Sequence, residues 1–184
     1  IFFFFYTLAA DFIVTSKADS GSGTLREAIT LSASNGSAEK DYIKFNLPGS
    51  TVLDRRISLT TALPLLSSNL VIDGSTQPGE KFQASDAKIQ IVPGNSGFDA
   101  FVLLNIDGFE LYGVYITGFA NSVPRKIGFE SPTAALYIEN SKNIQIGAPG
   151  KGNVFFDNSY AISTWYTSIT DGSSLPIMGA ENLK

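Results

Sequence analysis

Carboxylates offer the one route to acid–base catalysis in this sequence, because it contains no histidine and no cysteine. A suitably spaced pair of them could cleave a glycosidic bond. The candidate catalytic residues are Asp107, Glu139 and Asp157, each on or next to a short apolar run. Asp107 lies two positions after the turn residue Asn105, whereas Glu139 lies one position before the matching Asn140. These offsets place the acids on different faces and favour a chain that is not an enzyme.

Three tyrosines form a second group of candidate residues, because they are the outward members of alternating strand patterns: Tyr112, Tyr115 and Tyr137. Aromatic rings on an exposed sheet face can stack against sugar rings. Tyrosine is also a common sheet residue for packing reasons alone. The sequence therefore predicts these three residues as candidate glycan contacts and leaves the structural alternative open.

Composition narrows the class of partner. The 184 residues are 43% hydrophobic and 16% charged, with a net charge of −4 and a pI near 4.8. Such a chain can bury a core in one domain and is not of the disordered type. Basic residues gather only in pairs, at 55–56 and 125–126, which argues against nucleic acid as a partner. Without cysteine there are no disulfides. The composition does not indicate an oligomeric state.

Two matching turns are the strongest architectural signal. Asn105 and Asn140 each follow a short apolar run, and each is followed by a new alternation, Phe109/Leu111 in one and Ile144/Ile146 in the other. Asparagine tolerates the left-handed backbone conformation, so both are predicted to be corner residues. The spacing is 140 − 105 = 35 positions. When the polar excursion 120–133 is left out, this spacing approaches the number of residues in one turn of a stacked solenoid.

Short strands joined by tight turns recur through the rest of the chain, with strand cores predicted at 11–15, 42–47, 57–59, 70–72, 89–91, 101–104, 109–111, 114–116, 136–138, 144–146 and 154–156. One helix is predicted from Thr24 to Leu31. Thr24 and Glu27 have capping-box spacing, and Leu25, Ala28 and Ile29 form an apolar stripe. The pattern favours an all-β solenoid, with the helix covering its first layer.

The predicted organisation has three parts. Residues 1–10 are an apolar run ending in two alanines, typical of the remnant of a secretory signal peptide. The run is too short to span a membrane. An ordinary buried strand is the alternative reading. Residues 11–56 form an N-terminal cap, and 57–184 form stacked coils that continue beyond the chain end.

Three segments together resemble one family. GTLREAI (23–29), LVIDGSTQPG (70–79) and IQIGAPGKGNV (144–154) are similar, in that order, to motifs of secreted bacterial proteins with a pectin-lyase-like fold and an SLREAI-type N-terminal segment. The resemblance covers roughly residues 12–165. It departs at Phe156-Asp157, where the family has small residues. It implies a right-handed parallel β-helix and a bacterial protein that is secreted or held at the cell surface.

The resemblance also indicates a class of function. We expect a non-catalytic module for adhesion or carbohydrate binding, with an extracellular polysaccharide or cell-surface glycan as partner. One alternative is a polysaccharide lyase or glycoside hydrolase, because β-helix enzymes of both kinds use acid clusters, the lyases with Ca²⁺. No cofactor is expected, and Ca²⁺ is the one alternative considered. The other alternative is a purely structural spacer within a larger surface protein.

Overall fold

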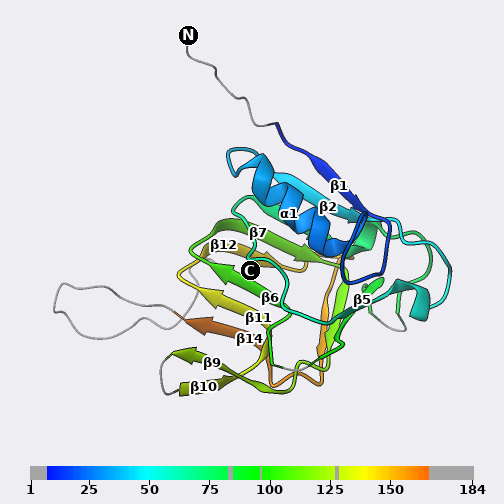
Figure 1. Ribbon diagram of the computed structural model, residues 1–184. Coiled ribbons are helices and arrows are strands. Elements are labelled where there is room, and N and C mark those ends of the chain that lie inside the picture. Colours follow the sequence, from blue (N-terminus) through cyan, green and yellow to red (C-terminus); the bar gives the residue numbers. More distant parts are fainter. Residues whose placement is uncertain (1–7, 83–84, 96, 127–128, 166–184) are drawn as a thin grey trace, which may run out of the picture.

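The computed structural model describes residues 8–82, 85–95, 97–126 and 129–165. Most of the predicted signal segment, residues 1–7, and the tail 166–184 lie outside this part. The described chain forms three parallel sheets, one antiparallel hairpin, two short 3-10 turns and one α-helix (Figure 1). Its helix is α1 (Leu25–Asn35), and the two 3-10 turns are η1 (Leu53–Arg55) and η2 (Gly74–Thr76).

The largest sheet has five strands in the order β1-β2-β4-β7-β12. Their bounds are β1 (Asp11–Val14), β2 (Asp41–Phe45), β4 (Leu70–Asp73), β7 (Asp107–Tyr112) and β12 (Lys142–Ile146). All neighbours are parallel. Two strands of the predicted N-terminal cap, β1 and β2, therefore share a sheet with strands from much later in the chain.

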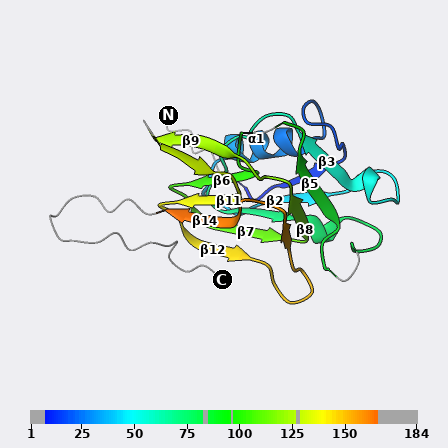
Figure 2. The same cartoon turned by 90° about the horizontal axis from the view of Figure 1, so that it is seen from below.

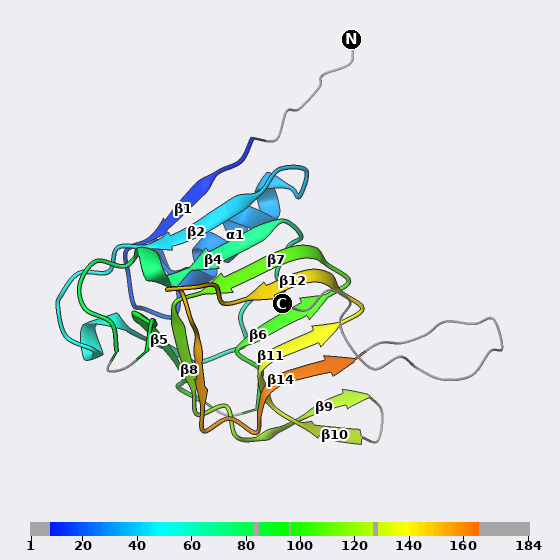
Figure 3. The same ribbon diagram turned by 180° about the vertical axis from the view of Figure 1, so that it is seen from behind.

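The second and third parallel sheets are smaller. One has the order β13-β8-β5-β3, and the other β14-β11-β6. The bounds are β3 (Arg56–Leu59), β5 (Ile89–Pro93), β8 (Val114–Thr117), β13 (Val154–Phe156), β6 (Phe101–Leu104), β11 (Ala134–Glu139) and β14 (Tyr160–Trp165). The four-stranded sheet stands across the ends of the other two (Figure 2 and Figure 3).

The predicted fold class, an all-β right-handed parallel β-helix, is wrong. The described chain is a mixed arrangement of small, separate parallel sheets and a helix, without a continuous solenoid. The polar excursion 120–133 contains the antiparallel hairpin of β9 (Ser122–Lys126) and β10 (Phe129–Pro132). Alternation predicts which residues face inward, but it does not determine how sheets are joined.

The core is built from inward residues that lie in register on neighbouring strands. In the five-stranded sheet Phe109 pairs with Leu70 on one side and with Ile144 on the other, and all three are buried. Parallel pairing places these side chains about 4.8 Å apart in the hydrogen-bonding direction. The predicted alternation thus selects core residues correctly in these strands.

Asn105 and Asn140 are corner residues, as predicted. Their φ angles are 56° and 48°, in the left-handed region that asparagine tolerates. The backbone amide of Asn105 donates to the carbonyl oxygen of Glu139 at 3.0 Å, so the two corners are bonded to each other. These corners join the three-stranded sheet to the five-stranded sheet.

Helix α1 begins with a modified form of the predicted capping box. The hydroxyl of Thr24 accepts from the amide of Glu27 at 3.2 Å, as expected. The Glu27 carboxylate accepts from the amide of Gly23 at 2.6 Å, whereas in a standard capping box it accepts from the amide of the cap residue, here Thr24. The helix extends to Asn35, beyond the predicted end, and lies against β1 and β2 (Figure 1). Within the described residues, no helix combines the length and the apolar character that a membrane span requires.

Candidate functional site

A groove on the outer face of the four-stranded sheet is the strongest candidate site. Four residues cross this face in one register row: Arg56 on β3, Gln90 on β5, Tyr115 on β8 and Val154 on β13. The groove is half-open, has a volume of about 450 Å³ and is lined by Val52, Lys81, Phe82, Ser85, Gln90, Tyr115 and Val154. This size, and a mostly apolar lining with a few polar groups, are typical of small-molecule sites.

Gln90 supplies a buried hydrogen-bond donor to this groove. Its side-chain oxygen accepts from Nε of Arg56 at 2.7 Å, and the residue is only 7% exposed. A guanidinium group can only donate, so this contact fixes which end of the amide faces Arg56. The amide nitrogen of Gln90 has no hydrogen-bond partner within the described residues. Because a buried donor without a partner is unfavourable, this nitrogen needs an acceptor from beyond the described residues, and water or a ligand in the groove can supply it.

The aromatic wall of the groove comes from the loop between η2 and β5. The ring of Phe82 lies 6.5 Å from that of Tyr115, tilted by 57°. The guanidinium carbon of buried Arg55 lies 4.9 Å from the centre of the Phe82 ring. The Phe82 amide donates to the carbonyl of Ala87 at 2.8 Å, which closes the loop. Phe82 is therefore held in place before any ligand binds.

Charge at the groove is balanced within the same loop. Lys81 forms an ion pair with Asp86. Asp86 also accepts from the amide of Gly152 at 3.1 Å, which links this loop to the turn between β12 and β13. The hydrogen bond from Lys81, followed by that from Gly152, holds the pKa of Asp86 below its ordinary value. At neutral pH the charge of Lys81 is therefore compensated by Asp86.

The contacts of Asp86 predict a pH-dependent anchor for the loop. A carboxylate whose pKa is lowered in the folded state stabilises that state above its ordinary pKa of about 3.9, and the effect is lost as pH falls through the lower folded value. We expect the Gly152 amide to exchange with solvent more slowly in the wild type than in Asp86→Ala at pH 5 to 7. The difference should vanish only as pH falls through the lowered pKa of Asp86, which lies below the ordinary value of about 3.9. Amide hydrogen exchange read by NMR at matched pH tests this, and equal rates at neutral pH would refute the anchor.

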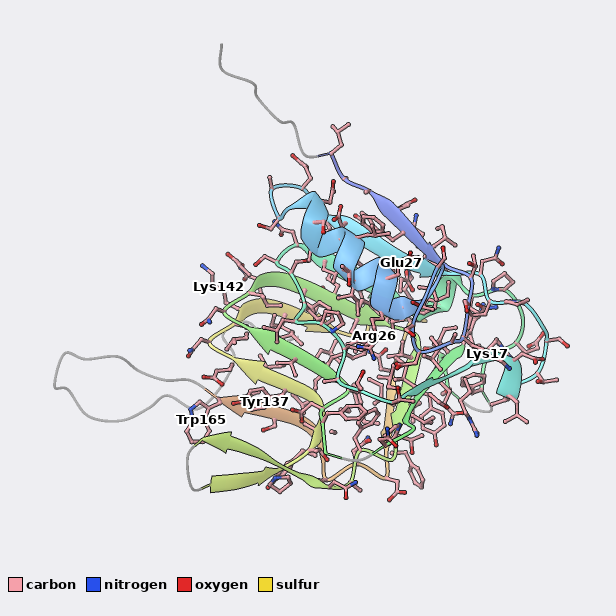
Figure 4. All side chains as sticks on the ribbon, viewed as in Figure 1. Lys17, Arg26, Glu27, Tyr137, Lys142 and Trp165 are labelled. Carbon is pink, nitrogen blue, oxygen red and sulfur yellow. The ribbon has the colours of Figure 1, made fainter. Side chains whose placement is uncertain are left out.

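Of the three predicted tyrosines, the structure places Tyr115 in the groove and the other two elsewhere. Tyr112 lies on the five-stranded sheet, is buried and donates to Glu110 at 2.7 Å. Burial, together with that hydrogen bond, raises the pKa of Tyr112. Tyr137 lies on the three-stranded sheet (Figure 4), where its hydroxyl donates to Glu139 at 2.6 Å. Neither residue lines the groove.

The candidate acids do not form one site. Asp107 begins β7, and its hydrogen bond from Asn143 holds its pKa below the ordinary value, so it stays ionised at neutral pH. Glu139 ends β11 on a different sheet, and its carboxylate is engaged by Tyr137. Asp157 lies at another corner, where its carbonyl accepts from the amide of Gly118 at 3.0 Å. The structure therefore places Asp107 and Glu139 on different sheets and Asp157 at a corner after β13.

Two other acids of the five-stranded sheet, Glu110 and Asp73, are engaged in ion pairs. Glu110 bonds Lys40 at 2.6 Å, and Asp73 bonds Lys151 at 2.6 Å. Burial acts to raise the pKa of Glu110, but the hydrogen bonds from Lys40 and from Tyr112 outweigh it and lower that pKa. Among the described residues no three acidic side chains are grouped so that they could hold a metal ion.

Sequence reasoning missed most of the groove, including Lys81, Phe82, Ser85, Gln90 and Val154. The alternation Ile89-Gln90-Ile91 does mark Gln90 as an outward residue. The loop that covers it carries no periodic pattern from which its path could be predicted.

Comparison with known proteins adds no identification. The sequence matches no protein-family model and none of the curated proteins. The resemblance to secreted proteins of the pectin-lyase-like class therefore stays a prediction, and functional inference depends on the groove itself.

Proposed function

We propose that the chain is a non-catalytic carbohydrate-binding module of a secreted or cell-surface bacterial protein, and that the groove is its binding site. The observation that carries the proposal is the buried amide of Gln90, which lies in register with Tyr115 and whose nitrogen has no hydrogen-bond partner within the described residues. A sugar offers what this pair of groups requires. Its hydroxyl and ring oxygens accept hydrogen bonds, and its C–H face packs on aromatic rings.

The charge of the groove favours a neutral sugar. Lys81 is neutralised by Asp86, and the other lining residues carry no charge. Tyr115 and Phe82 supply apolar surface, while Gln90 and Ser85 supply polar contacts. Shallow binding by a mainly preformed groove suits attachment to a polysaccharide or a cell surface, where several weak contacts combine.

Binding to a polysaccharide panel tests the proposal. The panel holds neutral glucan, mannan, xylan and galactan beside the polyanions pectin and alginate, and is read by affinity gel electrophoresis followed by calorimetry. We expect retention by a neutral member. Tyr115→Ala should weaken that binding about tenfold through loss of a central aromatic contact. Tyr137→Ala, the same change on another sheet, should alter it less than about twofold.

Three outcomes would overturn the proposal. A blank panel favours the structural spacer. Equal losses for Tyr115→Ala and Tyr137→Ala remove the groove as the site. Release of reducing ends or unsaturated products, with or without Ca²⁺, favours the lyase or hydrolase alternative when Asp107→Ala or Glu139→Ala abolishes it.

A further inference from the structure

Phe156 continues the wall of the groove toward the end of the four-stranded sheet. Alternate residues of a strand share a face, so Phe156 lies on the same face of β13 as Val154, which lines the groove. The residue between them, Phe155, packs against the core. Phe156 lies in register with Thr117 on β8, just as Val154 does with Tyr115.

The exposure of Phe156 is unusual for so large an apolar residue beside a groove. It is 62% exposed, whereas its neighbour Phe155 is partly buried. An isolated exposed apolar side chain needs no explanation, but one that extends an apolar groove increases the contact surface offered to a ligand. Covering a phenylalanine side chain contributes about 1.5–3 kcal/mol when burial is complete.

Strand geometry sets the length of ligand that would contact both aromatic residues. Two residues along a strand span about 6.7 Å, and neighbouring strands lie about 4.8 Å apart. Phe156 is therefore displaced from Tyr115 by roughly 8 Å along a diagonal of the sheet. A single sugar ring held between Tyr115 and Gln90 does not extend over Phe156, whereas a short oligosaccharide running along β8 and β13 does.

We propose that Phe156 forms a second aromatic subsite and that the groove recognises a neutral oligosaccharide of at least two sugar units. This inference rests on the proposed function. It specifies the class of ligand as an oligomer, where the groove alone would also accept a monosaccharide. The subsite supplies stacking surface, and the Gln90 amide supplies the directional contact at the other end.

The dependence of affinity on chain length tests the subsite. Gluco-, manno-, xylo- and galacto-oligosaccharides of one to six units are titrated by calorimetry into the wild type, Phe156→Ala and Tyr160→Ala. Tyr160 is an exposed aromatic residue on β14, away from the groove, and serves as the matched control. We expect wild-type affinity to rise with length and Phe156→Ala to bind the longer members about fivefold more weakly, as loss of a partly covered ring implies. Phe156→Ala should bind the single-unit sugars as tightly as the wild type does. Tyr160→Ala should bind sugars of every length as tightly as the wild type does.

The failures of the two proposals are distinguishable. If Phe156→Ala matches the wild type at every length, the second subsite is wrong and the groove proposal stands. If the wild type binds no oligosaccharide, the proposed function itself fails. Tighter binding of uronate oligomers than of the neutral series would overturn the neutral class of ligand.

Discussion

Gly113→Ala is expected to lower the free energy of unfolding by roughly 2–6 kcal/mol, the sum of backbone strain and overpacking. Gly113 joins β7 to β8 with φ = 63°, a conformation that disfavours any residue with a Cβ atom. A Cβ placed there would lie 2.8 Å from Cα of Ser75 and 2.9 Å from the carbonyl carbon of Gly74. It would be closer still to the Ser75 amide nitrogen. These are backbone atoms of η2, which has little freedom to retreat.

Gly150→Ala separates the contribution of backbone strain from that of overpacking. Gly150 also has a positive φ, 73°, but a Cβ there meets open space. We expect this variant to lose only the strain contribution, about 1–3 kcal/mol. Urea unfolding followed by circular dichroism measures both variants. Equal losses would show that the corner at Gly113 is less tightly packed than the structure indicates.

Local features of the fold could be predicted from the sequence because they depend on near neighbours. The alternation around Phe109 and Ile144 identifies inward residues, and asparagine identifies the corners at Asn105 and Asn140. The Thr24 cap also follows from spacing alone. Each of these signals reflects a conformational preference or a contact within a few residues.

The fold class could not be predicted in this way. Short strands separated by turns are equally compatible with a continuous solenoid and with separate small sheets, because both bury alternate residues. The resemblance favoured the solenoid, and the structure has three separate sheets with a helix against β1 and β2. The excursion 120–133 shows the same limit, since its hairpin pairing depends on contacts that no periodic pattern predicts.

The groove depends on contacts between distant segments. Phe82 reaches Tyr115 across 33 positions (115 − 82), and Asp86 reaches Gly152 across 66. The sequence identified Tyr115 by its strand position but ranked Tyr112 and Tyr137 beside it. Only the path of the loop over the sheet distinguishes them. The role of Gln90 likewise depends on Arg56, which fixes the orientation of its amide.

Gln90→Glu is expected to weaken carbohydrate binding roughly a hundredfold, with the fold retained. A glutamate at this position can still accept from Arg56, now as an ion pair, so the contact behind the groove survives. Its second oxygen replaces the amide nitrogen. A donor is thereby exchanged for a negatively charged acceptor, which a sugar ring oxygen cannot bond because that oxygen has no proton to donate.

Gln145→Glu provides the matched control for net charge. Gln145 lies on β12 of the five-stranded sheet, in register with Glu110, and does not line the groove. We expect this variant to bind carbohydrate as the wild type does. Thermal unfolding of both variants monitors their folding independently of binding.

Calorimetric titration of a neutral oligosaccharide into the wild type, Gln90→Glu and Gln145→Glu tests the groove most directly. If the Gln90 amide is the donor that recognises the sugar, Gln90→Glu binds the oligosaccharide about a hundredfold more weakly than the wild type, and Gln145→Glu does not. Wild-type affinity in a folded Gln90→Glu protein would contradict this role and leave the groove without its directional contact.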